Sequence, residues 1–303
     1  MPAIIFLLFV LAQAAVAEQQ ADLSGIPEIT APTYSANAGP RVAIDAAHHN
    51  FHTADSRYRP FAALLTADGY RVSSWQQQFS HAALKDVDVL VITNALPAAQ
   101  ARNWSAPPAS AFTAAEIKEL SSWVENGGAL LLIADHMPFP AAAAELARAF
   151  GFLFYDGYLL DKTRKEQQGL VTFRVEDGSL QAHPIVDGAN GRASISSVTT
   201  FLGQAFLAPP EAQALLELGQ RHFLFFPQVP GKIGKKTTQI SAETWLQGAT
   251  LEYGKGRLAV FGEAAAFTAQ TNSKGNKVGM NHALGQNNAA FLLNTLYWLY
   301  PSP

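Results

Sequence analysis

Acidic and histidine side chains follow three apolar runs of this sequence at the points where those runs end. The first run ends at Asp45, with His48 three residues later; a second leads into Asp135 and His136, and a third into Glu263. Ligands of open parallel sheets bind beyond the carboxyl ends of the strands, so we expect these five residues to converge in one cleft. Imidazoles gathered with carboxylates suit general acid-base chemistry or a divalent metal ion.

Each of these residues also has a structural interpretation. Asp45 and Asp135 could cap following helices, and Glu263 could bind backbone amides of its own loop. The spacing lacks the regular helical pattern of zinc proteases, so it indicates metal only weakly, and a divalent metal is one candidate cofactor. The joint placement at strand ends favours a functional cleft over five separate structural roles.

Three further polar residues, His49, Asn50 and His52, lie in the loop that carries His48. We expect them to shape contacts to a substrate in the same cleft. The structural alternative for His52 is a position on the surface.

The elements that must position these residues alternate between short apolar runs and helical patterns. The sequence predicts strands at residues 42–45, 70–72, 88–94 and 129–134, and helices at 60–69, 113–126 and 141–150. This alternation predicts a doubly wound, mainly parallel α/β sheet.

The alternation weakens after Phe150. Segments 170–175 and 223–226 are predicted to be strands of an antiparallel extension of the sheet, followed by a hairpin at 250–261 and a last helix at 287–300. Lys232 to Lys236 form a basic loop that is expected to be a solvated surface turn.

The amino-terminal 17 residues predict a signal peptide. An apolar run from Ile4 to Leu11 is followed by the small-x-small triplet Ala15-Val16-Ala17 and then by polar residues. Cleavage after Ala17 leaves a periplasmic or secreted protein; the alternative is an uncleaved anchor helix, for which the run is short. Residues 18–40 are rich in Pro, Ala, Ser and Gly and predict a linker, which leads into one domain over residues 41–303.

Composition excludes several classes of function. The net charge of −3 offers no basic footprint for nucleic acid. No second apolar stretch reaches membrane-spanning length, so no membrane span is expected in the mature chain. The absence of cysteine removes disulfides, thiolate metal sites and a cysteine nucleophile.

Several ordered segments resemble the uncharacterised family called domain of unknown function 4350. They are residues 44–53, 57–61, 183–188, 254–257, 262–270, 279–281 and 294–299, together with Asn288. That family is similar in fold to class I glutamine amidotransferase-like proteins, including the trehalose-utilisation type, so the resemblance implies a flavodoxin-like sheet. It implies no activity, because the amidotransferase cysteine is missing. Among these segments, Asn281 is expected to bind ligand, whereas His183 fits the ordering of a turn with Pro184 at least as well as catalysis.

Two hypotheses of function follow. The first is a hydrolase-like or metal-assisted enzyme that acts on a small polar molecule related to carbohydrate. The second is a non-catalytic module that holds a sugar or a partner's segment in the same cleft. A Ser-His-Asp hydrolase is poorly supported, because the sequence has no Gly-x-Ser-x-Gly elbow.

Overall fold

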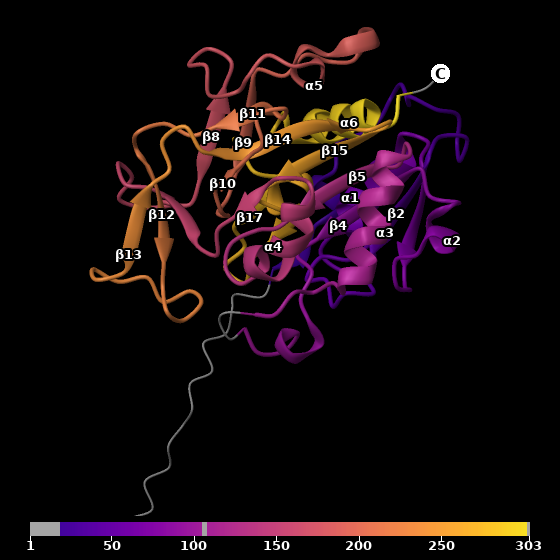
Figure 1. Ribbon diagram of the computed structural model, residues 1–303. Helices are drawn as coiled ribbons and strands as arrows, with labels where there is room; N and C mark the ends of the chain where they lie inside the picture. The colour runs from indigo at the N-terminus through magenta and orange to yellow at the C-terminus, as the bar shows by residue number, and fades with distance from the viewer. Residues whose placement is uncertain (1–18, 105–107, 302–303) are drawn as a thin grey trace, which may run out of the picture.

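A computed structural model describes residues 19–104 and 108–301 of the chain (Figure 1). The predicted signal peptide, residues 1–17, lies outside the described residues. Within those two ranges, no helix is both long enough and apolar enough to cross a bilayer.

The centre of the molecule is a nine-stranded sheet. Its main path runs β3 (Arg71–Trp75), β2 (Arg41–Asp45), β4 (Val89–Thr93), β5 (Ala129–Ile133), β15 (Gly256–Phe261), β14 (Leu246–Tyr253), β10 (Phe206–Leu207) and β6 (Leu153–Phe154), with β11 (Gln213–Glu217) beside β14. The first five strands of this path are mutually parallel, and the remaining pairs are antiparallel. The predicted neighbouring parallel strands at 42–44, 89–92 and 130–133 are therefore confirmed.

The helices are α1 (Arg59–Ala67), α2 (His81–Leu84), α3 (Ala114–Glu125), α4 (Phe139–Ala149), α5 (Pro184–Asp187) and α6 (Asn288–Leu299). Short 3-10 turns lie at Leu23–Gly25, Ala98–Gln100, Ala189–Gly191 and Ala265–Phe267. A capping box between Thr113 and Glu116 begins α3, as the Thr-x-x-Glu pattern predicts. α4 begins at Phe139, two residues earlier than expected, because Pro140 fits its first turn.

Two hydrophobic cores lie on opposite faces of the parallel strands. Side chains of a strand alternate between faces, so Val42 and Ile44 of β2 join the core under α1 and α6, whereas Ala43 joins the core under α3 and α4. β4 and β5 are buried at every position, which explains their continuous apolar sequence.

Two strands predicted to extend the main sheet lie elsewhere. β8 (Val171–Arg174) pairs only with β9 (Ser197–Thr200), and β12 (His222–Phe226) lies between β7 (Tyr158–Asp161) and β13 (Thr238–Ser241) in a separate sheet. The antiparallel extension consists instead of β14, β10, β6 and β11. Apolar strand patterns identify strands but not their partners, and this explains the difference.

The segment that composition predicts as a linker packs against the domain. β1 (Gln20–Ala21) pairs with β16 (Ala269–Thr271), which pairs in turn with β17 (Lys277–Gly279). The Thr33 hydroxyl donates to Asp68 at 2.8 Å. Residues 20–40 therefore belong to the folded unit, although they lack the apolar period from which helices and strands are predicted.

Candidate functional site

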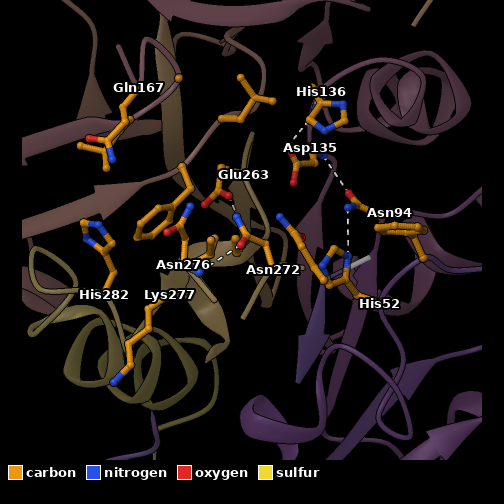
Figure 2. A pocket seen from close by; sticks show the side chains of 18 of the residues that line it. His52, Asn94, Asp135, His136, Gln167, Glu263, Asn272, Asn276, Lys277 and His282 are labelled. Atoms are coloured by element: carbon orange, nitrogen blue, oxygen red, sulfur yellow. Dashed lines mark hydrogen bonds between the residues drawn. The ribbon is translucent and has the colours of Figure 1, made fainter. Parts of the chain in front are cut away.

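A cavity of about 290 Å³ lies beyond the carboxyl ends of the parallel strands (Figure 2). Its polar lining combines two carboxyl groups, three imidazoles, the lysine Lys277 and several amides, and three phenylalanines supply much of the apolar wall. The main lining residues are Asp135, Glu263, His52, His136, His282, Asn94, Gln167, Asn272, Asn276, Phe51, Phe139 and Phe201. We call this cavity the carboxyl pocket.

Asp135 and Glu263 face the pocket from equivalent positions beyond the carboxyl ends of β5 and β15. Phe261 of β15 is paired in register with Ile133 of β5, and each acid follows its strand by two residues. Glu263 is 2% exposed, and its two carboxyl oxygens accept hydrogen bonds from the backbone N–H groups of Ala265 (2.9 Å) and Ala266 (2.8 Å). Burial raises the pKa of Glu263 well above its ordinary value, the negative charge of Asp135 raises it further, and the backbone hydrogen bonds oppose this rise. Burial and the neighbouring Asp135 thus favour the protonated form of Glu263 over its charged form.

Asn94 organises the floor of this pocket. It follows β4 directly and has a left-handed backbone (φ 48°), which Asn tolerates better than most residues. Its Oδ1 accepts from the Asp135 backbone N–H at 2.8 Å, so its Nδ2 is the atom that donates to His52 Nδ1, at 3.1 Å. Asn94 thus fixes the start of the Asp135 loop and the orientation of His52 together.

Burial keeps His52 neutral, and the contact with Asn94 decides which ring nitrogen carries the proton. Since Nδ1 accepts from Asn94, the single ring proton of neutral His52 is on Nε2. Gln270 Nε2 lies 3.2 Å from this atom and Gln270 Oε1 is buried without a partner, so the Gln270 amide accepts the proton when it is turned with Oε1 toward the ring. Burial lowers the pKa of His52 to about 3, and the charge on Arg57 lowers it in the same direction. His52 is 3% exposed and lines the pocket from beneath, so its predicted place in the cleft is observed and the surface alternative is not.

His136 lies on the opposite wall. Its Nδ1–H donates to the backbone oxygen of Met137 at 2.8 Å, and its ring stacks on Tyr158 with centroids 4.7 Å apart. With Nδ1 carrying the proton, Nε2 of the neutral ring is an acceptor. Asp135, His136 and Glu263 therefore converge as predicted, although they come from two different loops.

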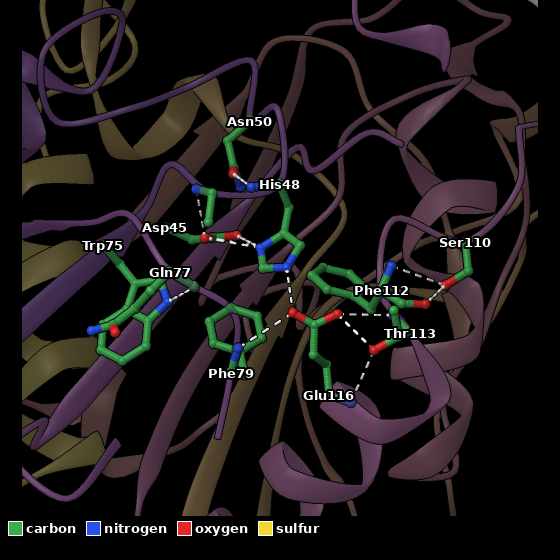
Figure 3. A network of polar contacts seen from close by, with 11 residues as sticks. Asp45, His48, Asn50, Trp75, Gln77, Phe79, Ser110, Phe112, Thr113 and Glu116 are labelled. Carbon is green, nitrogen blue, oxygen red and sulfur yellow. Dashed lines mark hydrogen bonds and ion pairs between the residues drawn. The ribbon is translucent and has the colours of Figure 1, made fainter. Parts of the chain in front are cut away.

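Asp45 and His48 form a second, separate polar cluster (Figure 3). His48 Nδ1 lies 2.9 Å from Asp45 Oδ2, and Nε2 lies 3.0 Å from Glu116 Oε1. Phe79 stacks on the imidazole at a centroid distance of 4.6 Å. Burial alone would lower the pKa of His48, but the hydrogen bonds and charges of Asp45 and Glu116 outweigh burial and raise it.

The expected convergence of all five residues is thus wrong for Asp45 and His48, which do not line the carboxyl pocket. The alternation of side chains explains the separation. Asp45 continues the Ala43 face of β2, toward the core that contains Phe79 and Phe112, whereas Asp135 continues the Ile133 face of β5. The two clusters therefore lie on opposite sides of the sheet plane, and both ring nitrogens of His48 are occupied.

The other predicted residues have mainly structural contacts. His49 is exposed, and Asn50 donates to the Thr93 backbone oxygen at 3.0 Å. Asn281 donates to Asp22 (2.8 Å) and to the Gln270 backbone oxygen (3.0 Å), and it fastens the amino-terminal segment rather than lining the pocket. His183 accepts from the Ile185 N–H and caps α5, which agrees with its interpretation as the organiser of a turn with Pro184.

The pocket does not have the geometry of a metal site. Across residues 19–104 and 108–301, no group of three or more His, Asp or Glu side chains is placed to hold one ion. The three-ligand arrangement that a shared metal requires is therefore not formed by Asp135, His136 and Glu263. Hydrogen bonding and proton transfer are the chemistry that these residues can perform.

Sequence reasoning overlooked several residues of these clusters, among them the pocket residues His282, Gln167, Asn272 and Asn276. Three more take part in the hydrogen-bond networks around His48 and His52. Glu116 was visible only as the third residue of a capping box, and its contact with His48 spans 68 positions. Asn94 was visible as the last residue of a predicted strand. It could therefore have been selected for the same reason as Asp45, Asp135 and Glu263. No local sequence pattern indicates that Gln270 contacts His52, because the two residues are 218 positions apart.

No protein-family model matches the sequence, and no curated protein matches it significantly. Among solved structures, the N-terminal domain of mmIFT52 is similar, with a TM-score of 0.56 and 17% identity over 86% of this chain and 98% of that one. A cytoplasmic protein from Salmonella typhimurium has a TM-score of 0.51 and 15% identity over 86% of this chain and 99% of its own. A ThuA-like protein from Bacteroides uniformis aligns over 89% of this chain and 93% of its own, with a TM-score of 0.45 and 14% identity. The first two similarities show a shared fold, a mixed α/β architecture with a mainly parallel sheet.

Proposed function

We propose that the carboxyl pocket performs hydrolase-like acid-base chemistry on a small polar molecule related to carbohydrate. The observation that carries this proposal is the convergence of Asp135 and Glu263 on one pocket, where burial and the negative charge of Asp135 raise the pKa of Glu263. In this proposal Glu263 donates a proton to a leaving oxygen, and Asp135 accepts one from an attacking water.

The chemistry of the lining supports the choice of substrate. Amides at Asn94, Gln167, Asn272 and Asn276 offer donors and acceptors to hydroxyl groups, and phenylalanines offer flat apolar surface to a sugar ring. The volume of about 290 Å³ is near the lower end of small-molecule sites, which suits one or two sugar units better than a chain.

We also propose that the fold belongs to the class I glutamine amidotransferase-like group, with a flavodoxin-like sheet. The order of the five parallel strands, β3-β2-β4-β5-β15, supports this, because it corresponds to the 2-1-3-4-5 order of that arrangement. The finer resemblance to domain of unknown function 4350 rests on its ordered motifs alone. Export with cleavage after Ala17 is a further proposal, which the mass of the mature amino terminus would test.

Turnover of a panel of disaccharides and methyl glycosides, followed by the release of reducing sugar, tests the enzyme proposal, because their poor leaving groups need a proton from Glu263. Glu263→Gln and Asp135→Asn should each lower kcat by roughly 10²–10⁴-fold while the circular dichroism spectrum is retained. Turnover that survives both substitutions would show that these carboxyl groups do not carry the reaction.

A non-catalytic binding module is the second candidate. Both oxygens of Glu263 already accept backbone hydrogen bonds, an arrangement that also suits a fixed wall for a bound ligand. Calorimetric titration with the same sugars separates the two proposals: a binding module binds a sugar with no turnover, and Glu263→Gln then changes affinity alone.

A further inference from the structure

The hairpin formed by β12 and β13 carries a concentration of positive charge. Between His222 and Ala242 the sequence has three lysines, Lys232, Lys235 and Lys236, and no Asp or Glu, although the whole chain has a net charge of −3. All three lysines are exposed. Figure 1 shows β12 and β13 at the outer edge of the molecule, on the side away from α2 and β2. We call residues 222–242 the basic arm.

Apolar side chains are exposed beside these lysines. Val229 is 48% exposed, and Ile233 and Ile240 are each 37% exposed, which makes three of the few large apolar side chains on the described surface. The loop of the arm also encloses a hollow of about 400 Å³, lined in part by Phe226, Val229, Lys232 and Lys236. Ammonium groups and branched apolar side chains thus occur together on one short segment.

This combination fits one kind of partner. Anionic phospholipid headgroups attract lysines near the surface, and the adjoining interface accepts apolar side chains that water does not. A soluble anion would use the lysines and leave Val229 and Ile233 without a role. We propose that the basic arm docks the protein on a membrane surface that carries anionic phospholipid.

The arm is held firmly by the body of the protein, as a docking element requires. β12 pairs with β7 over four residues, and the Gly231 N–H donates to the Tyr158 hydroxyl at 2.8 Å. That hydroxyl donates in turn to the Met137 backbone oxygen at 3.1 Å, and the same ring stacks on His136. Contact of the arm with a membrane would therefore set the orientation of the carboxyl pocket relative to the bilayer.

Flotation of the mature chain, which begins at Glu18 after the proposed cleavage, with vesicles tests the proposal. One set of vesicles is pure phosphatidylcholine, and the other contains a phosphatidylglycerol fraction. The triple variant Lys232→Glu, Lys235→Glu, Lys236→Glu should bind the anionic vesicles roughly 100-fold more weakly than the wild type. This corresponds to a loss of about fivefold for each lysine removed. Val229→Ser with Ile233→Ser should also weaken binding, and added NaCl should weaken it further by screening.

The matched control is Lys85→Glu, Lys118→Glu, Lys255→Glu, which changes net charge equally at exposed lysines outside the arm. It should retain most of the wild-type binding. The apolar segment from Ile4 to Leu11 is absent from the mature chain, so it cannot bind the vesicles in place of the arm.

Three outcomes would overturn the proposal. They are equal binding of the wild type to both vesicle sets, an equal loss in the control and arm variants, and release by inorganic phosphate beyond that caused by NaCl of equal ionic strength. The last outcome would identify the ligand as a small anion.

Discussion

Glu263 and Asp135 follow register-paired positions of two neighbouring parallel strands, and their carboxyl groups face each other across the carboxyl pocket (Figure 2). Neither strand alone gives this relationship, because it depends on the pairing of β15 with β5. The pair has consequences that can be measured without knowing the substrate.

Replacement of Glu263 should change how stability depends on pH. The folded state keeps the Glu263 proton, while the unfolded chain releases it above its ordinary pKa of about 4.5, so stability falls as pH rises through that window. The slope should reach at most about 1.4 kcal/mol per pH unit and should be absent in Glu263→Gln. Urea unfolding from pH 5 to 8 measures it. Asp135→Asn is the control, in which burial alone still raises the pKa of Glu263, so the slope should persist but end at a lower pH. An unchanged slope in Glu263→Gln would assign it to another group.

His48→Gln should destabilise the protein by about 3–5 kcal/mol, because Asp45 and Glu116 would lose the cation between them. The raised pKa of His48 makes its contribution fully present below pH 6.5 and progressively lost as pH rises through the folded-state value. The loss from substitution should therefore be larger at pH 6 than at pH 9, as measured by urea unfolding. His81→Gln, at an exposed histidine, should shift stability by less than about 0.5 kcal/mol. Equal losses at both pH values would contradict the ionic interpretation of the cluster.

Asn94→Ala and Asn94→Gly separate backbone from side-chain effects at one position. Both lose the hydrogen bonds to His52 and to the Asp135 N–H, but only alanine must also adopt the left-handed backbone, at an additional cost of about 1–2 kcal/mol. Differential scanning calorimetry should therefore rank wild type above Asn94→Gly and Asn94→Gly above Asn94→Ala. If alanine were the more stable of the two, the left-handed conformation would not be required.

His52→Gln should reduce the sensitivity of the protein to acid. The unfolded chain protonates this histidine below pH 6.5, whereas the folded state resists until about pH 3, so the wild type loses stability as pH falls across that range. His183→Gln provides a graded comparison, because burial lowers the pKa of His183 to about 4 and its window is narrower. Urea midpoints from pH 7 to 3 should show similar changes of slope for the two variants down to about pH 4.5, and only the His52 effect should persist below about pH 4. Identical slopes in wild type and His52→Gln would indicate that His52 is already protonated in the folded state.

Much of the fold follows from local pattern. The apolar runs at β2, β4 and β5, the capping box of α3 and the hairpin turn at Gly254 are encoded in neighbouring residues, and each prediction based on them is confirmed. Partner choice is not local, and for this reason β8 and β12 were assigned to the wrong sheet.

The candidate site could be predicted in part for the same reason. Placement after a strand identified Asp135, His136 and Glu263, but it did not distinguish the two faces of the sheet. Alternation places Asp45 opposite Ile44, but only the observed packing shows that Ile44 and Ile133 share a face and that Asp45 and Asp135 therefore do not. The partners of His48 and His52 were not available, because Glu116 and Gln270 reach them only through the packing of distant elements.

The pairing of β1 with β16 also constrains when the pocket can exist. Asp22 and Asn281 are 259 positions apart, and Gln19, at the start of the same segment, lines the pocket. Contacts of such separation close a very long loop, so they form late and depend on the rest of the chain being in place. A chain that emerges amino end first, from a ribosome or through a membrane, would already carry His52, Asn94 and Asp135 but would still lack one wall of the cavity. Ligand binding should therefore begin only when synthesis or transport is almost complete.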